Sequence, residues 1–170
     1  MKMKLMTLVA IAATAIATPA LAADATGSIT VLRPLTVTKN ADLGFGTVIR
    51  PDSGSGTVTV SNAGARSVAN GVVALSSTSA SAAQFTIDGE GAQSVSVTIP
   101  ASFTLNNGSG SGSLTVTTSS DLANPALVSL SGTLGSAGSK TFNVGGEITI
   151  ASTTNSGAYT GTLTVTAAYN

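Results

Sequence analysis

Few residues in this chain carry side chains that could do chemistry. The chain has no His, no Cys and no Trp, so the commonest general base, the thiolate nucleophile and the usual zinc ligands are all missing. The closest pair of carboxylates, Asp88 and Glu90, stands in the run Asp-Gly-Glu-Gly. Because calcium takes about six to eight oxygen ligands, two side chains fall well short of a site. We therefore predict a solvated turn there.

Two further motifs also have structural explanations. Ser139 and Lys140 stand side by side without any supporting motif, and we interpret them as the start of a strand. Gly145 and Gly146 lack the strand, loop and helix that surround a phosphate-binding glycine loop, so they predict a bulge that shifts the register of a strand. No catalytic, metal-binding or cofactor-binding residue emerges, and we predict that the protein is not an enzyme.

The first 22 residues are typical of a secretory signal peptide. Lys2 and Lys4 precede an uncharged run, and the segment ends in Ala20-Leu21-Ala22, the small-x-small pattern that signal peptidase recognises. We predict cleavage after Ala22, which leaves one mature domain, residues 23–170. The sequence thus predicts export through the inner membrane to the periplasm, the cell surface or the medium. No later stretch approaches ~20 apolar residues, so no transmembrane segment is expected after cleavage.

The composition of the mature chain favours an all-β domain. Loss of the two leader lysines leaves five Lys and Arg against seven Asp and Glu, a net charge of −2 that offers nucleic acid or anionic lipid no basic patch. Without cysteine, an exported domain must be held by its core and its backbone pairing, which about 150 residues can supply. Thr, Ser, Val, Ala and Gly dominate and only 8% of residues are charged, as in β-rich proteins.

Alternating apolar residues between turn signals predict roughly nine to eleven strands, at the spacing typical of an antiparallel β-sandwich. Asn70-Gly71, between Val68 and Val73, predicts a two-residue hairpin. Residues 106–112, which are all Asn, Gly or Ser, predict an exposed loop. The predicted inward-facing residues are Phe45, Val60, Leu75, Phe85, Ile87, Val97, Phe103, Val116, Leu130, Phe142, Ile148, Leu163 and Val165.

The two ends of the mature chain have distinct patterns. From Gly157 to Asn170, Tyr and aliphatic residues alternate with threonines, which predicts one long antiparallel strand that closes the domain with one face toward the core. At the other end, Ile29 and Val31 lie in an arm, Ala23–Leu32. Pro34 follows it and cannot donate to a ladder, so we expect the chain to break there before a true strand begins.

Four segments in order carry a family resemblance. They are Leu35-Thr36-Val37-Thr38, Asp42-Leu43-Gly44-Phe45-Gly46, Phe142-Asn143-Val144-Gly145-Gly146, and Gly157-Ala158-Tyr159-Thr160-Gly161-Thr162-Leu163-Thr164-Val165. Together they resemble a secreted proteobacterial family known only as domain of unknown function 4402, over essentially the whole mature chain. That family in turn resembles immunoglobulin-like, pilin-like sandwiches of the chaperone-usher class and related spore-coat-like secreted domains.

The pilin resemblance implies assembly by strand exchange. Pilins of that class end in an alternating apolar strand with a penultimate aromatic residue and a glycine fourteen residues from the end, where this chain has Tyr169 and Gly157. The resemblance implies a periplasmic chaperone as first partner, and then the arm of a neighbouring copy in a homo-oligomer. The cysteine pair of many such pilins is absent here, and the arm is short. The residues so implicated are Ile29, Val31, Gly157, Tyr159, Leu163, Val165 and Tyr169.

Taken together, these features predict a secreted structural or adhesive surface protein, such as a fimbrial subunit. The alternative is a self-contained secreted binding module, for example for carbohydrate, that uses the loops at one end of the sandwich. Such a module normally presents exposed aromatic rings for stacking, and four Phe and two Tyr, most on core-facing positions, leave few for that purpose.

Overall fold

The computed structural model describes residues 21–123 and 125–170, and within these ranges every regular element is a β-strand. The predicted leader, residues 1–22, lies outside them except for its last two residues. The chain divides into two units, residues 1–30 and 31–170. The strands, all in the second unit, are β1 (Thr36–Ala41), β2 (Val48–Ile49), β3 (Ser55–Val60), β4 (Arg66–Ala69), β5 (Val73–Ala74), β6 (Ala83–Glu90), β7 (Ser94–Thr98), β8 (Ser102–Asn107), β9 (Ser113–Ser120), β10 (Ala126–Ser129), β11 (Ala137–Ala151), β12 (Tyr159–Thr160) and β13 (Thr166–Tyr169).

The strands form two main sheets. The larger has the order β1-β6-β11-β9-β8-β12, with β3 attached to β11 and β4 to β3; the smaller has the order β10-β7-β13, and β2 pairs with β5 separately. All these pairings are antiparallel. The prediction of an all-β, antiparallel, sandwich-like fold is therefore confirmed.

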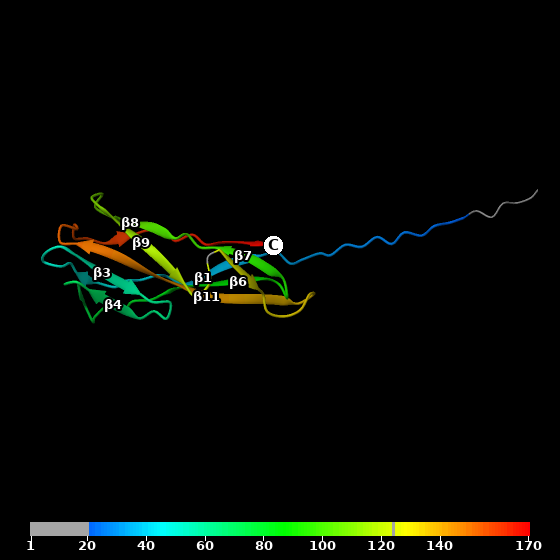
Figure 1. The fold of residues 1–170 in the computed structure, drawn as a ribbon, viewed down its shortest axis with the longest axis horizontal. Coiled ribbons are helices and arrows are strands. Elements are labelled where there is room, and N and C mark those ends of the chain that lie inside the picture. Colours follow the sequence, from blue (N-terminus) through cyan, green and yellow to red (C-terminus); the bar gives the residue numbers. More distant parts are fainter. Residues whose placement is uncertain (1–20, 124) are drawn as a thin grey trace, which may run out of the picture. The chain divides into compact units, whose positions relative to one another are not determined.

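The longest strand, β11, connects the two ends of the larger sheet. Its first half, Ala137–Val144, pairs with β6, and its second half, Gly146–Ala151, pairs with β3. In Figure 1, β3, β4, β8 and β9 lie toward one end of this unit and β1, β6 and β7 toward the other, with β11 extending between them. A single strand thus fixes the positions of both halves.

The two glycines in the middle of β11 allow its neighbours to come close. A Cβ on Gly146 would lie 2.8 Å from Cγ1 of Val116 in β9, and one on Gly145 would collide with the carbonyl of Val60 in β3. The predicted register shift at this point is wrong, because residues with even numbers, such as Phe142 and Ile148, face inward on both sides of the pair. The glycines provide close approach and not a bulge.

The core consists of two clusters that share β11. Phe142 of β11 packs with β6, β7 and β10 in the first cluster, where its ring stacks on Phe85 with the centroids 5.7 Å apart. Ile148 of β11 packs with β3 and β9 in the second cluster, and Leu43 contacts both clusters. The predicted inward residues that are buried are Val60, Phe85, Ile87, Val97, Val116, Leu130, Phe142 and Ile148. Those that are half-buried are Phe45, Phe103, Leu163 and Val165.

Two local predictions need correction. Asn70 and Gly71 have the positive φ values that the predicted turn needs (55° and 82°), but β4 then pairs with β3, and β5 with β2, so no hairpin forms between them. The reason is that Val72 enters the second core cluster (5% exposed), which leaves the predicted inward residue Leu75 37% exposed. Within the predicted exposed loop 106–112, Asn107 is buried at the end of β8.

The burial of each phenylalanine predicts how much it contributes to the free energy of unfolding. Phe142 is 1% exposed, so Phe142→Ala should lower the free energy of unfolding by about 3–5 kcal/mol. Phe103→Ala is the matched control and should cost clearly less, because the Phe103 side chain is only half-buried. Urea unfolding followed by circular dichroism measures both. Equal losses for the two variants would contradict this assignment of the core.

Candidate functional site

A groove with a volume of about 1020 Å³ opens in the second unit. One of its walls is formed by residues 39–50 and the other by residues 154–163. Its floor is mostly apolar, so a ligand or chain segment with apolar side chains would fit it. The residues at the floor are Phe85, Phe103, Leu105, Leu114, Ile148 and Ile150.

The first wall is held by hydrogen bonds to Ser81 and to Arg66 of β4. Gly44 exchanges two backbone hydrogen bonds with Ser81, each 2.9 Å long. The guanidinium of Arg66 donates to the carbonyl of Phe45 (2.9 Å) through Nη1 and to that of Leu75 (2.7 Å) through Nη2. These bonds fix the backbone of the wall, while the side chain of Phe45 packs against the second core cluster.

The second wall belongs to the closing segment, which is not the single long strand that the sequence predicted. Tyr159–Thr160 pairs with β8 of the larger sheet, and Thr166–Tyr169 pairs with β7 of the smaller sheet. Residues 161–165 between them pair with no strand of the described chain. The segment crosses from one sheet to the other because Leu163 and Val165 pack on the first core cluster. The crossing leaves a stretch of backbone without a ladder.

The inner face of β1 is open beside this groove. Val37 pairs opposite Ile87, and Lys39 opposite Phe85, and residues directly opposite in an antiparallel pair point to the same face of the sheet. Ile87 is fully buried on that face, yet Val37 is 37% exposed, and Lys39 lines the groove. This part of the core face therefore lacks a covering layer.

Three of the residues implicated by the sequence line the groove together, Gly157, Tyr159 and Leu163. The phenol Oη of Tyr159 donates to the carbonyl of Asn155 (2.8 Å), so the hydroxyl is satisfied locally. Val165 follows on the same face and packs against the first core cluster.

Gly157 has a packing role at the end of β8. Its φ of 146° lies in the region that side chains rarely adopt, and a Cβ there would lie 2.8 Å from Oδ1 of Asn107. The amide of Asn107 is buried, donates to the carbonyl of Ser156 (3.3 Å) and accepts from Ser109. Substitution of Gly157 would therefore disturb the entry of the closing segment into the groove wall.

The other implicated residues lie apart from the groove lining. Tyr169 accepts a hydrogen bond from the backbone N–H of Glu90 (2.6 Å) and donates one to the carbonyl of Arg33 (3.0 Å). Ile29 and Val31 are 87% and 79% exposed, and neither belongs to a strand. The structure thus brings three of the seven residues together at the groove, Gly157, Tyr159 and Leu163.

Sequence reasoning missed the roles of two charged residues. Glu90 was predicted in a solvated turn but ends β6 and is 2% exposed, with its carboxylate bound by Arg33 and by the N–H of Gly135. Asp88 is exposed as predicted. The available signal for this pairing was the position of Arg33 on the inward side of an otherwise apolar alternation, where a cation needs a partner.

Other kinds of site were sought in the same part of the chain. Residues 21–123 and 125–170 contain no group of three or more His, Cys, Asp or Glu that could hold a metal ion. No helix in these residues is long and apolar enough to cross a membrane. The six aromatic side chains are all buried or half-buried, and four of them, Phe45, Phe85, Phe103 and Tyr159, line the groove.

Residues 35–169 match the family profile described as Domain of unknown function (DUF4402). The chain belongs to this family. The match to DUF4402 extends from the residue before β1 to the end of β13, so it includes both walls and the floor of the groove but not the arm. Neither the curated proteins nor the solved structures include a match to the chain.

The open groove of this DUF4402 domain should bind an apolar dye in the native state. Such dyes fluoresce on exposed hydrophobic surface, and we expect a signal without denaturant. Leu163→Asp should reduce it several-fold because it places a charge on the groove lining. Thr164→Asp is the control, since its side chain points to the opposite face and is exposed. If both variants fold and lose the same share of the fluorescence, the dye binds outside the groove.

Proposed function

We propose that this protein is an exported, non-enzymatic structural or adhesive subunit of the cell surface, immunoglobulin-like and pilin-like, whose groove is filled by an added β-strand. The observation that carries this proposal is the juxtaposition of the unpaired backbone of residues 161–165 and the open inner face of β1 at one groove. These N–H and C=O groups lie near water, since Gly161, Thr162 and Thr164 are exposed, and they form an open edge with which a further strand can pair. Addition of a strand, called β-augmentation, would satisfy them and cover the apolar floor.

The strand that suits the groove best is the arm of a second copy of the chain. In the arm, small or apolar residues alternate with polar ones, so an extended arm has one face for the apolar floor and one for water. Residues 23–31 are exposed, Leu32 is half-buried, and none of them belongs to a strand. The apolar face consists of Ala23, Ala25, Gly27, Ile29 and Val31, and the polar face of Asp24, Thr26, Ser28 and Thr30.

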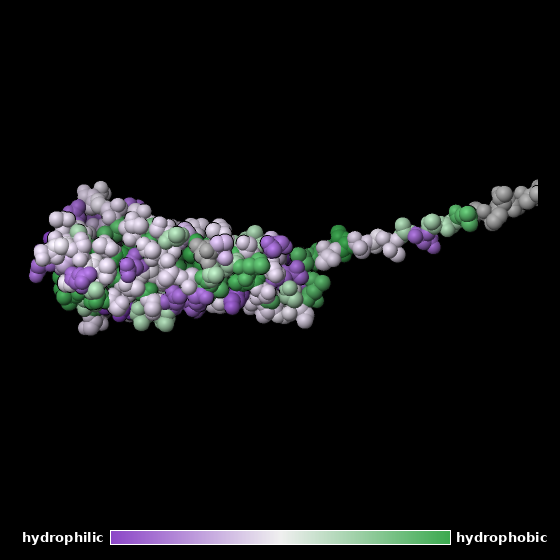
Figure 2. All heavy atoms as spheres, viewed as in Figure 1, coloured by the Kyte–Doolittle hydropathy of each residue, from purple (hydrophilic) through white to green (hydrophobic). Residues whose placement is uncertain are grey.

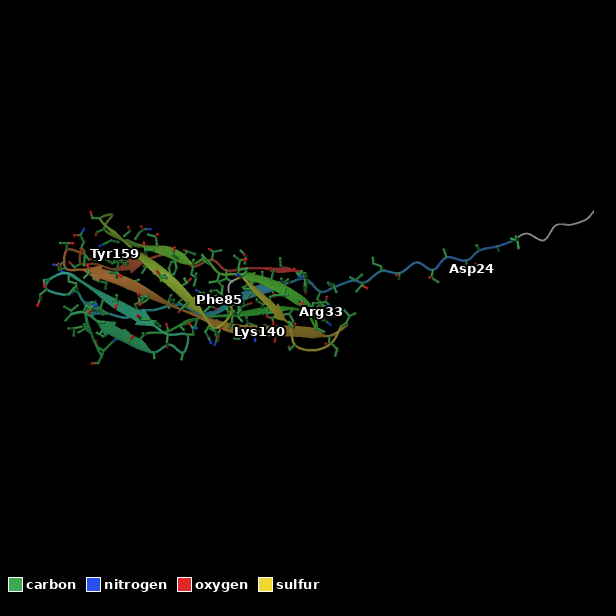
Figure 3. The ribbon with its side chains drawn as sticks, viewed as in Figure 1. Asp24, Arg33, Phe85, Lys140 and Tyr159 are labelled. Carbon is green, nitrogen blue, oxygen red and sulfur yellow. The ribbon has the colours of Figure 1, made fainter. Side chains whose placement is uncertain are left out.

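The placement of the groove supports assembly in a chain of copies. Figure 3 shows Arg33 and Tyr159 toward opposite ends of the second unit, with Phe85 between them. The arm joins the second unit at the end where Arg33 lies, whereas Tyr159 and Phe85 line the groove. A contact between the arm of one copy and the groove of the next uses two different surfaces, and such head-to-tail contacts repeat into open filaments.

The chaperone is the second proposed partner. Before assembly, the groove would expose apolar side chains and strand edges that promote aggregation. In the pilin resemblance, a periplasmic chaperone lends a strand to the groove until a neighbouring arm replaces it. The predicted signal peptide would deliver the chain to the compartment where such a chaperone acts. Figure 2 shows hydrophobic residues in several places among hydrophilic and neutral ones on the visible face of the second unit.

A self-contained binding module remains the alternative, because the groove volume also matches that of small-molecule sites, roughly 300–1,000 Å³. The strand proposal is preferred because a small ligand would leave the backbone of residues 161–165 unpaired, whereas a strand would pair it.

Deletion of the arm, Ala23–Leu32, tests the function directly. Under strand exchange, the deletion variant should still be exported but should no longer form the heavy, detergent-resistant oligomers expected of the full chain. A synthetic peptide of residues 23–33 should bind the purified deletion variant. At about 100 times its dissociation constant, the peptide should add about 2.7 kcal/mol to the free energy of unfolding.

Matched peptides make this test specific. Replacement of Ile29 and Val31 by Asp should abolish binding, because both side chains would enter the apolar floor. Replacement of Ser28 and Thr30 by Asp is the control, changes the opposite face and should preserve binding. A full-length protein that is monomeric and unfolds reversibly without a chaperone, together with a peptide that does not bind, would overturn the proposal.

A further inference from the structure

The first strand of the domain begins only after Pro34, which lacks a hydrogen-bond donor. β1 pairs with β6 from Thr36 opposite Asp88, and the same antiparallel register continued by two residues puts Pro34 opposite Glu90. Because proline has no N–H, the backbone ladder cannot continue through this pair. The root of the arm, Arg33 and Pro34, therefore needs another attachment to the sheet.

Side chains supply that attachment. The phenol Oη of Tyr169 accepts from the backbone N–H of Glu90 (2.6 Å) and donates to the carbonyl of Arg33 (3.0 Å). The carboxylate of Glu90 accepts from the backbone N–H of Arg33 through Oε2 (3.3 Å). A hydroxyl and a carboxylate thus replace the backbone groups that would otherwise join the root of the arm to β6.

The carboxylate of Glu90 lies at the centre of this arrangement. Its side chain is 3% exposed, and its Oε2 lies 3.6 Å from Nε of Arg33. Its Oε1 accepts from the N–H of Gly135, in the loop between β10 and β11. A buried charge is costly unless it is paired and hydrogen-bonded, so Glu90 holds Arg33 and this loop in place together.

Gly89 makes room for the tyrosine. A Cβ at this position would collide with Oη of Tyr169 and would lie 2.9 Å from Cδ1 of Leu35. Tyr169 is held in turn by β13, where it pairs opposite Val95 of β7. The junction therefore joins four parts of the fold: the root of the arm, the end of β6, the β10–β11 loop and the closing segment.

We propose that this junction, centred on Glu90 and Tyr169, is the anchor of the arm. It fixes the residue at which the arm leaves the domain, and it passes tension on the arm into β6. Because β6 lies between β1 and β11, such tension reaches the interior of the larger sheet and not only its edge strand. The fixed exit point follows from the geometry alone, whereas the role under tension rests on the proposed function, in which the arm joins one copy to the next.

The mobility of the backbone tests the anchor. NMR relaxation of the mature chain, with an excess of the peptide of residues 23–33 to fill the groove and keep the chain monomeric, should give order parameters of about 0.85 from Arg33 onward and below about 0.6 in the arm. In Tyr169→Phe and in Glu90→Gln, the value at Arg33 should fall below about 0.6 while Thr38 in β1 stays near 0.85. In Tyr169→Phe, the Glu90 amide should also exchange about tenfold faster, because it loses its hydrogen-bond acceptor.

Tyr159→Phe is the matched control, because it removes a phenol hydroxyl that bonds only to Asn155 within its own loop. It should leave the mobility of Arg33 unchanged. An Arg33 as mobile as Ile29 in the unaltered protein, or unchanged by both junction variants, would overturn the anchor. If one variant does not fold, the unaltered protein and the other variant still show whether the junction holds Arg33. Failure of the full chain to oligomerise would instead overturn the proposed function and leave the relaxation test intact.

Discussion

The fold depends above all on the pairing of β11 with three neighbours. One half of this strand holds β6 and the other holds β3, while β9 pairs across its middle. The same strand supplies side chains to both core clusters. Because the chain has no disulfide to tie its parts together, the backbone ladder along β11 provides the connection between the halves. The two glycines at its midpoint are the local condition for this arrangement, since they let β3 and β9 approach.

The groove arises from a competition between backbone pairing and burial. If the closing segment continued along β8 beyond Thr160, it would keep its ladder, but Leu163 and Val165 would not reach the first core cluster. By crossing to β7, the segment buries these side chains and leaves residues 161–165 without a partner. Burial of apolar surface contributes about 25 cal/mol per Å², whereas a backbone group that stays near water loses little. The crossing and the open groove thus have one cause.

Much of the fold could be predicted from the sequence. Alternation at Phe85 and Ile87, and again at Phe142 and Ile148, is a local property of the chain, and it identified buried residues correctly. The positive φ values at Asn70 and Gly71 could be predicted as well. Such features need only the nearest neighbours in the sequence, which is why they are accessible without a structure.

The incorrect predictions concern which strands and which residues pair with one another. Of the two strands beside Asn70, β4 pairs with β3, the strand just before it, and β5 pairs with the more distant β2. The burial of Glu90 depends on Arg33, 57 residues away. The crossing of the closing segment depends on where both sheets lie. Pairing between segments far apart depends on the relative free energies of whole arrangements, and alternation alone does not contain that information. The groove could not be predicted from the sequence for the same reason, although Tyr159 and Leu163 in its wall had been identified as candidate residues.

The position of β13 has a consequence for the order in which the core forms during folding. It is the last strand of the described residues, yet Ala167 and Tyr169 pack on the first core cluster and Tyr169 donates a hydrogen bond to Arg33 near the first strand. Contacts between segments so far apart form slowly, because loop closure must come before any gain from packing. A chain that stopped before β13 would therefore lack part of its core. Completion of the core is therefore among the late steps of folding, and until that step the chain stays at least partly unfolded.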